Sequence, residues 1–457
     1  MTGTGQEQPA EARAILAGLF PAAAAAPAPA RPRSRGRAAW LAAGYAAAVA
    51  AGAGLLLLRQ AGTPAWQAMW AEDSWVFLPR ALAHPWSSLI SPYAQYLQLV
   101  PQLIADVVAR LPLRDAAAGF AVAGALVASG CAAFAYRASS GHISRPALRA
   151  LLAVSVLLLP TAIIEIANSG VDAPWYLMFA LFWALLWRPA SRRGMALAAL
   201  IAFAAMASNI LNLLYLPLVA ARLVALPRAR EHAVTAGWAA GAAFQVIGLV
   251  QSTRPDRIGP VPAALEFYGQ HVLVAAVAGW RLALALQAAA GIAACIAVAA
   301  LLVAAVVTWA VRQDRARIAP LAAASLGMGL LLAIIPALLR YWVPGTPSTS
   351  LWVPGSRYTA SAILMIDQLA IAGADALLRR RPASLPRARA AVVVTVLVAG
   401  LGTGWVTSFR YHNVRSASVP WSREYASYGR VLARQPDRPG GRYPALRLPL
   451  APARSPR

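Results

Sequence analysis

Long apolar runs recur along the whole chain, and no other feature restricts its fold as strongly. Each run is about 17 to 25 residues long, the length that an α-helix needs to cross roughly 30 Å of hydrocarbon. Of the 457 residues, 60% are hydrophobic and only 12% are charged. The sequence therefore predicts an all-α, polytopic integral membrane helical bundle of about eleven spans. The predicted spans are residues 38–58, 115–136, 149–167, 173–187, 195–210, 212–226, 233–250, 287–311, 319–340, 358–378 and 390–408.

The basic residues indicate how these spans are oriented. All 41 of them are arginines. They gather in every second connection, which by the positive-inside rule places the N-terminus inside. Because they lie between apolar runs rather than on one soluble face, the net charge of +25 does not indicate nucleic-acid binding. The clusters are residues 31–37, 137–149, 188–193, 222–230, 312–317 and 379–389.

This orientation divides the chain into three parts. Residues 1–37, rich in Ala, Pro and Arg, are predicted to be a disordered cytoplasmic arm. Residues 38–408 form the membrane core, and residues 409–457 form an outward tail. The outward connections of the core are predicted to be residues 59–114, 168–172, 209–211, 251–286 and 341–357. Cys131 and Cys295 lie in separate apolar runs, which indicates neither a disulfide framework nor a thiolate metal site.

The first outward connection, residues 59–114, contains the chemically richest segment. Glu72 and Asp73 are adjacent there, and carboxylates at a membrane boundary are unfavourable unless they are solvated or paired. They are candidates for a catalytic pair. Alternatively, they are a structural pair that forms a salt bridge with Arg80 or marks the end of the first helix. Near-helical spacing in the second half predicts an amphipathic helix at the interface. Its apolar positions are Leu97, Val100, Leu103, Ile104, Val107, Val108 and Leu111.

Several of these features together resemble a known family. An acidic pair follows the first span, and Asn168 precedes a Trp-rich span. After the acidic pair comes the segment Tyr93-Ala94-Gln95-Tyr96-Leu97-Gln98-Leu99-Val100-Pro101. The pair Arg357-Tyr358 then enters a late span. This layout resembles the GT-C superfamily of polyprenyl-phosphate-sugar-dependent glycosyltransferases. The tail is much smaller than the C-terminal domains of many members and no extended acidic metal motif is present, so metal dependence stays open.

The resemblance implies an inverting sugar transfer on the outer face of the plasma (inner) membrane. The donor would be a polyprenyl-phosphate-linked sugar, the acceptor a glycan, lipid or protein of the cell envelope, and no other cofactor is implied. Asp73 is the first choice for general base, with Glu72 orienting the acceptor or acting in its place. Arg357 is the leading candidate for the phosphate, because a planar guanidinium can donate two hydrogen bonds at once. The alternative for Arg357 is a helix-end anchor to lipid headgroups.

Other polar residues of the outward connections are weaker candidates for substrate binding. Glu165 is expected either to bind a sugar hydroxyl or to pair with an outward arginine. Arg254 and Arg257 are second candidates for phosphate, or belong to a solvated loop with a local ion pair. His84 has no metal-ligand spacing such as H-E-x-x-H. The full candidate set is Asp73, Glu72, Arg357, Tyr358, Arg80, His84, Tyr96, Glu165, Asn168, Arg254 and Arg257.

Two other classes of function stay open. A secondary transporter or lipid flippase would usually show two related halves with ionisable groups near the bilayer midplane. No such halves are visible, and the ionisable groups gather at the predicted outer boundary. A non-catalytic membrane subunit with a similar fold is the third possibility. The sequence has no Walker A motif and no Gly-x-Ser-x-Gly elbow, so ATP-driven transport within this chain is unsupported.

Overall fold

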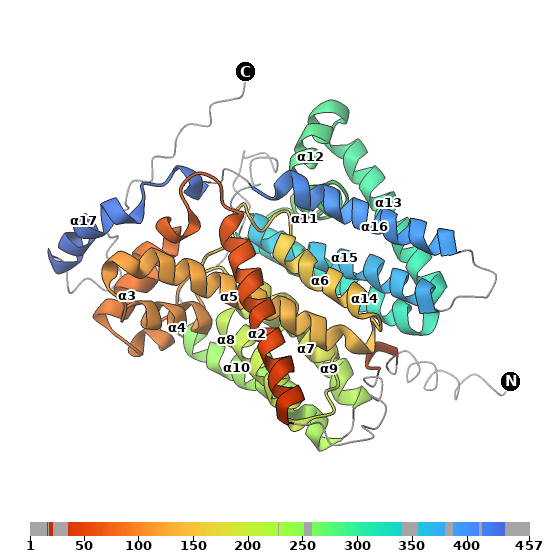
Figure 1. The fold of residues 1–457 in the computed structure, drawn as a ribbon, viewed down its shortest axis with the longest axis horizontal. Helices are drawn as coiled ribbons and strands as arrows, with labels where there is room; N and C mark the ends of the chain where they lie inside the picture. Colours follow the sequence, from red (N-terminus) through yellow and green to blue (C-terminus); the bar gives the residue numbers. More distant parts are fainter. Residues whose placement is uncertain are drawn as a thin grey trace.

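The computed structural model describes residues 16, 18–21, 35–226, 228–250, 258–340, 355–379, 387–410 and 414–434. In this part the chain is helical throughout, apart from connections and one isolated bridge between Tyr93 and Tyr96 (Figure 1). The predicted all-α class is confirmed. The helices are α2 Arg35–Leu58, α3 Leu78–Ala83, α4 Leu99–Val108, α5 Ala116–Ala138, α6 Pro146–Leu158, α7 Ala173–Leu186, α8 Arg192–Ser208, α9 Leu216–Ala225, α10 Ala233–Val250, α11 Val261–Tyr268, α12 Ala275–Ala290, α13 Ile292–Gln313, α14 Arg315–Arg340, α15 Ser356–Arg379, α16 Arg387–Ser408 and α17 Trp421–Arg434.

Within the described residues, seven helical segments are long and apolar enough to cross a membrane. The chain is thus a multi-pass membrane protein in outline, but the predicted number of eleven spans is not confirmed. Six of the seven coincide with predicted spans, and the seventh, Val261–Ala290, does not. The seven are Ala39–Leu58, Leu113–Gly141, Ala233–Val250, Val261–Ala290, Ile292–Gln313, Arg315–Leu339 and Ser356–Arg379.

The segment Val261–Ala290 corrects the prediction that residues 251–286 are a simple outward connection. Its polar residues interrupt the apolar pattern, but Gln270 and His271 are buried within the protein rather than exposed to lipid. Gly279, with a φ of 67°, breaks the segment into two parts. Arg281 in the second part donates a 3.3 Å hydrogen bond to the Thr407 carbonyl at the end of α16. The broken segment therefore packs along the C-terminal end of α16.

The predicted span 149–167 is wrong, because α6 ends at Leu158. Pro160 disfavours a helical conformation in the residue before it, and residues 159–172 form an irregular stretch instead. Arg59, at the end of α2, donates to the carbonyls of Leu157 and Leu159 at 2.6 and 3.1 Å. The cation thus binds carbonyls that a helix end leaves without partners.

Two further predicted spans are shorter than a bilayer requires. The 14 residues of α7 are buried on every side, as expected of a core helix rather than a lipid-facing span. Residues 212–226 contain the end of a 3-10 helix, Ile210–Tyr215, and the ten-residue α9, and the 3-10 helix follows a turn that begins at Asn209. The Asn209 side chain accepts a hydrogen bond from the Leu211 amide at 3.0 Å and so stabilises that turn.

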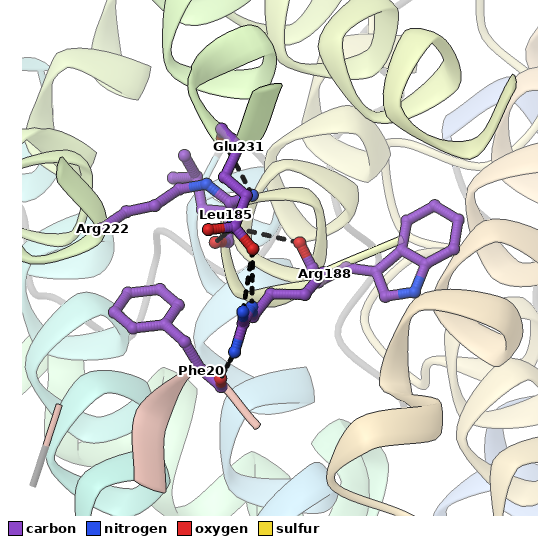
Figure 2. A network of polar contacts seen from close by, with 6 residues as sticks. Phe20, Leu185, Arg188, Arg222 and Glu231 are labelled. Atoms are coloured by element: carbon purple, nitrogen blue, oxygen red, sulfur yellow. Dashed lines mark hydrogen bonds and ion pairs between the residues drawn. The ribbon is translucent and has the colours of Figure 1, made fainter. Parts of the chain in front are cut away.

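The arginine-rich connections meet at one end of the bundle. Arg188 forms a 2.8 Å ion pair with Glu231 and donates to the Phe20 carbonyl at 3.2 Å (Figure 2). Arg222 donates to the carbonyls of Leu185 and Trp187 in the same network. Near the ends of α13 and α15, Arg379 lies 3.7 Å from Asp314.

These contacts also correct the prediction of a disordered arm at residues 1–37. Phe20 is only 1% exposed, and a Cβ at Gly18 would touch the backbone of Ala316. Residues 18–21 are therefore packed against the bundle, and α2 already begins at Arg35. The rest of the predicted arm lies outside the described residues.

The predicted outward connections meet at the other end. The 24 residues of α15 run from Ser356, beside Glu165, to Arg379, beside Asp314, which is a rise of about 36 Å. The first connection lies at the Ser356 end and includes α3 and α4, so the prediction of a helix in its second half is confirmed. In α4, Ile104 is buried and Val107 is exposed.

The C-terminal helix α17 packs on this first connection, close to α3 in Figure 1. The Trp421 indole donates to the Leu113 carbonyl at 2.8 Å, and the Tyr428 hydroxyl donates to the Ser74 carbonyl. Trp421 also joins a buried apolar cluster with Phe77 and Phe120. The described part of the tail thus covers the segment that contains Glu72 and Asp73.

Candidate functional site

Asp73 lies beneath the surface at the start of the turn that leads into α3. It is 1% exposed, and three donors surround its carboxylate. The Ser169 hydroxyl and the Gly170 amide donate to Oδ2 at 3.2 and 3.1 Å, and the Val171 amide donates to Oδ1 at 2.8 Å. Asp73 therefore joins the first connection to residues 169–171.

Glu72 is only half-buried, in contrast to its neighbour. The Tyr93 hydroxyl donates to Glu72 Oε1 at 3.2 Å. Burial and the adjacent Glu72 raise the pKa of Tyr93 well above its usual range, so the hydroxyl keeps its proton and donates. Arg80 stacks on the Tyr93 ring, 6.0 Å from the ring centre, and donates to the Pro92 carbonyl at 3.2 Å. Within the described residues, Arg80 forms no ion pair with Glu72 or Asp73.

Glu165 and Arg357 form an ion pair in the same region. Arg357 Nη1 lies 3.1 Å from Glu165 Oε1, and the Ser356 hydroxyl donates to Oε2 at 3.1 Å. The Glu165 side chain is 5% exposed and that of Arg357 is 25% exposed. Glu165 thus pairs with an arginine, as one of the two alternatives drawn from the sequence expected. Arg357 extends from the first turn of α15, where its guanidinium lies 5.4 Å from the centre of the Tyr358 ring.

Asp172 is a member of the cluster that the sequence did not single out. It is 1% exposed, and its Oδ2 atom has no hydrogen-bond partner among the described residues. Burial raises the pKa of Asp172 to about 6, the charge of Arg357 opposes this rise, and the charge of Glu72 adds to it. Asp172 directly precedes α7, a position typical of a helix start, so its sequence context indicates a cap rather than a site.

Arg415 is a second residue that the sequence did not single out. It belongs to the tail and binds backbone carbonyls of the irregular stretch 159–172. It is 1% exposed and donates to the carbonyls of Glu165, Ala167 and Asn168 at 2.9, 2.5 and 3.2 Å. Its guanidinium lies 4.8 Å from the centre of the Trp70 ring. The tail is rich in arginine throughout, so no sequence signal distinguishes this one.

Asn168 has a structural role in the same stretch. It adopts a left-handed backbone conformation with a φ of 60°, which asparagine tolerates better than most residues. Its side-chain amide donates to the Leu56 carbonyl at 2.9 Å. The residue therefore fixes the turn beside Asp73.

An apolar cavity of about 260 Å³ lies between α7, α14 and the N-terminal turn of α15. Two predicted site residues, Tyr96 and Tyr358, line it. Trp175 stacks edge to face on Tyr358, with 4.8 Å between ring centres. Because Tyr358 follows Arg357 directly, this cavity adjoins the ion pair. Its other lining residues are Gln95, Ile210, Leu211, Leu213, Leu214, Leu249, Pro336 and Leu339.

The remaining predicted candidates are His84, Arg254 and Arg257. His84 is exposed and ends α3, where its backbone amide donates to the Arg80 carbonyl. Arg254 and Arg257 lie outside the described residues. Over the described ranges, no group of three or more His, Cys, Asp or Glu side chains is arranged to hold a metal ion. Cys131 and Cys295 are both free thiols.

Asp73 should make the stability of the protein depend on pH. Burial and the nearby Asp172 raise the pKa of Asp73 from 3.8 to about 8, although the Val171 and Gly170 amides oppose this rise. Because the folded state holds a proton that the unfolded state has lost, this contribution is complete below about pH 4 and is lost as pH rises through about 8. The denaturation midpoint should therefore decrease as the pH rises from about 4 to about 8, and Asp73→Asn should flatten that decrease. If the denaturation midpoint depended equally on pH in the wild type and in Asp73→Asn, Asp73 would not be the group responsible.

No protein-family model matches this chain, and neither a curated protein nor a solved structure shows a significant match to it. The carboxylate cluster and its arginines are therefore interpreted from their own geometry.

Proposed function

We propose that the protein transfers a sugar from a polyprenyl-phosphate-linked donor to a hydroxyl of a cell-envelope acceptor, with inversion at the anomeric carbon. The observation that supports this most is the placement of a half-buried carboxylate and a phosphate-compatible arginine in one cluster. The charges of Glu72 and Arg357 both act on Tyr93 and on Asp172. The cluster would face the outer side of the plasma (inner) membrane.

Glu72 suits the role of general base better than Asp73. A base needs hydrogen-bond reach to the hydroxyl that it deprotonates. Glu72 is half-buried, and the Tyr93 hydroxyl donates to one of its oxygens. Asp73 is enclosed by three donors, and its raised pKa would leave it mostly protonated at neutral pH. The geometry thus favours the alternative in which Glu72, rather than Asp73, acts as the general base.

The reaction then proceeds as a single displacement. The acceptor oxygen bonds to the anomeric carbon while the bond from that carbon to the phosphate oxygen breaks. The acceptor proton passes to Glu72, and the departing polyprenyl phosphate carries its negative charge beside Arg357. Asp172 Oδ2, buried and without a partner among the described residues, can accept a hydrogen bond from a sugar hydroxyl. The isoprenoid chain would occupy the apolar cavity lined by Tyr96 and Tyr358.

The function is tested with purified protein and a mixed extract of polyprenyl-phosphate sugars carrying a labelled sugar. The proposal predicts release of unglycosylated polyprenyl phosphate and appearance of the label on an envelope acceptor. Neither product should form when the protein is heat-denatured. A wild-type protein that consumes no donor from the extract would contradict the proposal.

A transporter or flippase differs in its expected products. The irregular stretch 159–172 resembles the interrupted helices that line transporter sites. If the protein only moves the donor lipid, labelled lipid should cross proteoliposome membranes with its sugar still attached. Transfer without such movement supports the enzyme instead.

A further inference from the structure

A second and larger cavity lies away from the carboxylate cluster, between α2, α5, α7 and α8. Its volume is about 630 Å³, within the roughly 300–1,000 Å³ of ligand-binding pockets. Tyr45, Leu177 and Ile201 are among the residues that line it, and its walls are mostly apolar. It is called the α2–α8 groove here. Because α2 and α5 belong to candidate spans, the groove lies at membrane depth.

One end of the α2–α8 groove is cationic. Arg137, in the last turn of α5, lies 5.3 Å from the centre of the Trp187 ring and donates to Ser140 at 3.3 Å. Arg193, in the first turn of α8, lines the same groove. Both arginines belong to the connections that gather at the arginine-rich end. The groove's lining residues within the described chain include no aspartate or glutamate.

A charged mouth on an apolar groove fits an amphiphile with an anionic head. Basic pockets between transmembrane helices on the cytoplasmic side recognise anionic lipid headgroups. Arginine matches phosphate because its guanidinium presents several donors in one plane. A free phosphate would leave the apolar walls uncovered, and a zwitterionic lipid would neutralise the two cations less well.

We infer that the α2–α8 groove binds one anionic membrane phospholipid, with its phosphate at Arg137 and Arg193 and an acyl chain along the apolar walls. The groove extends to Val100 of α4, which belongs to the first connection. The bound lipid would thus contact the helix next to the proposed catalytic segment without entering it. This site is independent of the proposed sugar transfer.

Gly130 makes the inference testable with little disturbance of the fold. It lines the groove, and a Cβ at this position would meet no atom within 4 Å. Gly130→Leu should fill the groove while leaving the packing of α5 intact. Gly327 of α14 is the matched control, because a Cβ there also meets no atom within 4 Å and the residue lies outside the groove.

The experiment uses photoreactive phosphatidylglycerol with a diazirine in its acyl chain, added to purified full-length protein in detergent. Adducts should map to residues 127–134 and 194–201 and should be lost in Gly130→Leu but kept in Gly327→Leu. Arg137→Gln with Arg193→Gln should weaken binding by roughly 25-fold, about fivefold for each arginine. Arg315→Gln, at an exposed arginine outside the groove, should leave binding unchanged.

Three outcomes would overturn the inference. Labelling of Gly130→Leu at the wild-type level would place the lipid elsewhere. Equal labelling by a phosphatidylcholine probe would remove the role of the arginines. Displacement of the probe by polyprenyl phosphate at lower concentration than by phosphatidylglycerol would assign the groove to the donor lipid.

Discussion

Replacement of Arg357 by glutamine is expected to lower the free energy of unfolding by about 3–5 kcal/mol. Arg357 is the ion-pair partner of Glu165, whose side chain is 5% exposed. Removing the cation leaves a buried carboxylate that, among the described residues, accepts from the Ser356 hydroxyl and the Arg357 backbone amide. Leaving one buried charge without its partner lowers the free energy of unfolding more than replacing both members of the pair.

The double variant Arg357→Gln with Glu165→Gln separates structure from chemistry. It should recover most of the lost stability, because both members of the ion pair are then neutral and no unpaired charge is buried. Sugar transfer should stay low in the double variant, because the proposed phosphate ligand is still absent. Chemical denaturation in detergent measures the first quantity, and donor consumption measures the second.

Arg114→Gln is the matched control for this prediction. Arg114 and Asp115 form an exposed pair 3.6 Å apart, with 69% and 51% of their side chains accessible. Such surface pairs contribute roughly 0–1 kcal/mol, so this variant should change little. Equal effects of Arg114→Gln and Arg357→Gln on the denaturation midpoint would contradict the assigned role of the Glu165 pair.

Glu72→Gln is expected to reduce turnover by roughly 10²–10⁴-fold, the typical contribution of a general base. The amide keeps the size of the side chain and can still accept from the Tyr93 hydroxyl, but it cannot take up a proton. The apparent affinity for the donor should therefore change much less than the turnover. Tyr93→Phe provides a smaller perturbation, because it removes only the hydroxyl that orients Glu72.

Asp73→Asn should affect stability more than catalysis. Its carboxylate accepts from the amides of Gly170 and Val171 through its two oxygens. In asparagine an NH₂ group, which cannot accept a hydrogen bond, takes the place of one of these oxygens. A buried amide left without an acceptor reduces stability by about 1–3 kcal/mol. The two adjacent carboxylates should thus give opposite results, with Glu72→Gln folded and inactive and Asp73→Asn active but less stable.

The sequence predicted those parts of the fold that depend on local composition. Apolar length predicted the spans around α2, α5, α10, α13, α14 and α15. Arginine spacing predicted that the connections containing Arg188 and Arg379 share one end. Their contacts agree, because Arg188 donates to the Phe20 carbonyl, Gly18 lies against Ala316, and Arg379 pairs with the nearby Asp314. Both signals are contained within short windows of the chain.

What the sequence missed depends on tertiary contacts. The break after Leu158 is stabilised by Arg59, about 100 residues earlier in the chain, and by Arg415, about 250 residues later than the segment it supports. In the sequence, the mostly apolar residues 159–167 resemble a continuation of the span that contains α6. In the fold, Arg59 and Arg415 instead donate hydrogen bonds to backbone carbonyls of these residues. The segment 261–290 was missed for the opposite reason, because Gln270, His271 and Gln287 interrupt its apolar pattern in the sequence but are buried in the fold.

The candidate site was predicted in part for the same reason. Glu72, Asp73 and Glu165 are rare carboxylates in an apolar chain, so the sequence singled them out. Their different burial could not be inferred, since it arises from residues 169–171 folding over Asp73. Asp172 and Arg415 entered the cluster only through the fold.

In the proposed reaction, Glu72 removes a proton from the acceptor during sugar transfer. The most direct test is the rate of labelled-sugar transfer from the polyprenyl-phosphate extract by the wild type, Glu72→Gln and Asp73→Asn, each shown to be folded. We expect transfer by the wild type, measurable transfer by Asp73→Asn, and a loss of roughly 10²–10⁴-fold in Glu72→Gln. Wild-type turnover in folded Glu72→Gln would contradict the claim.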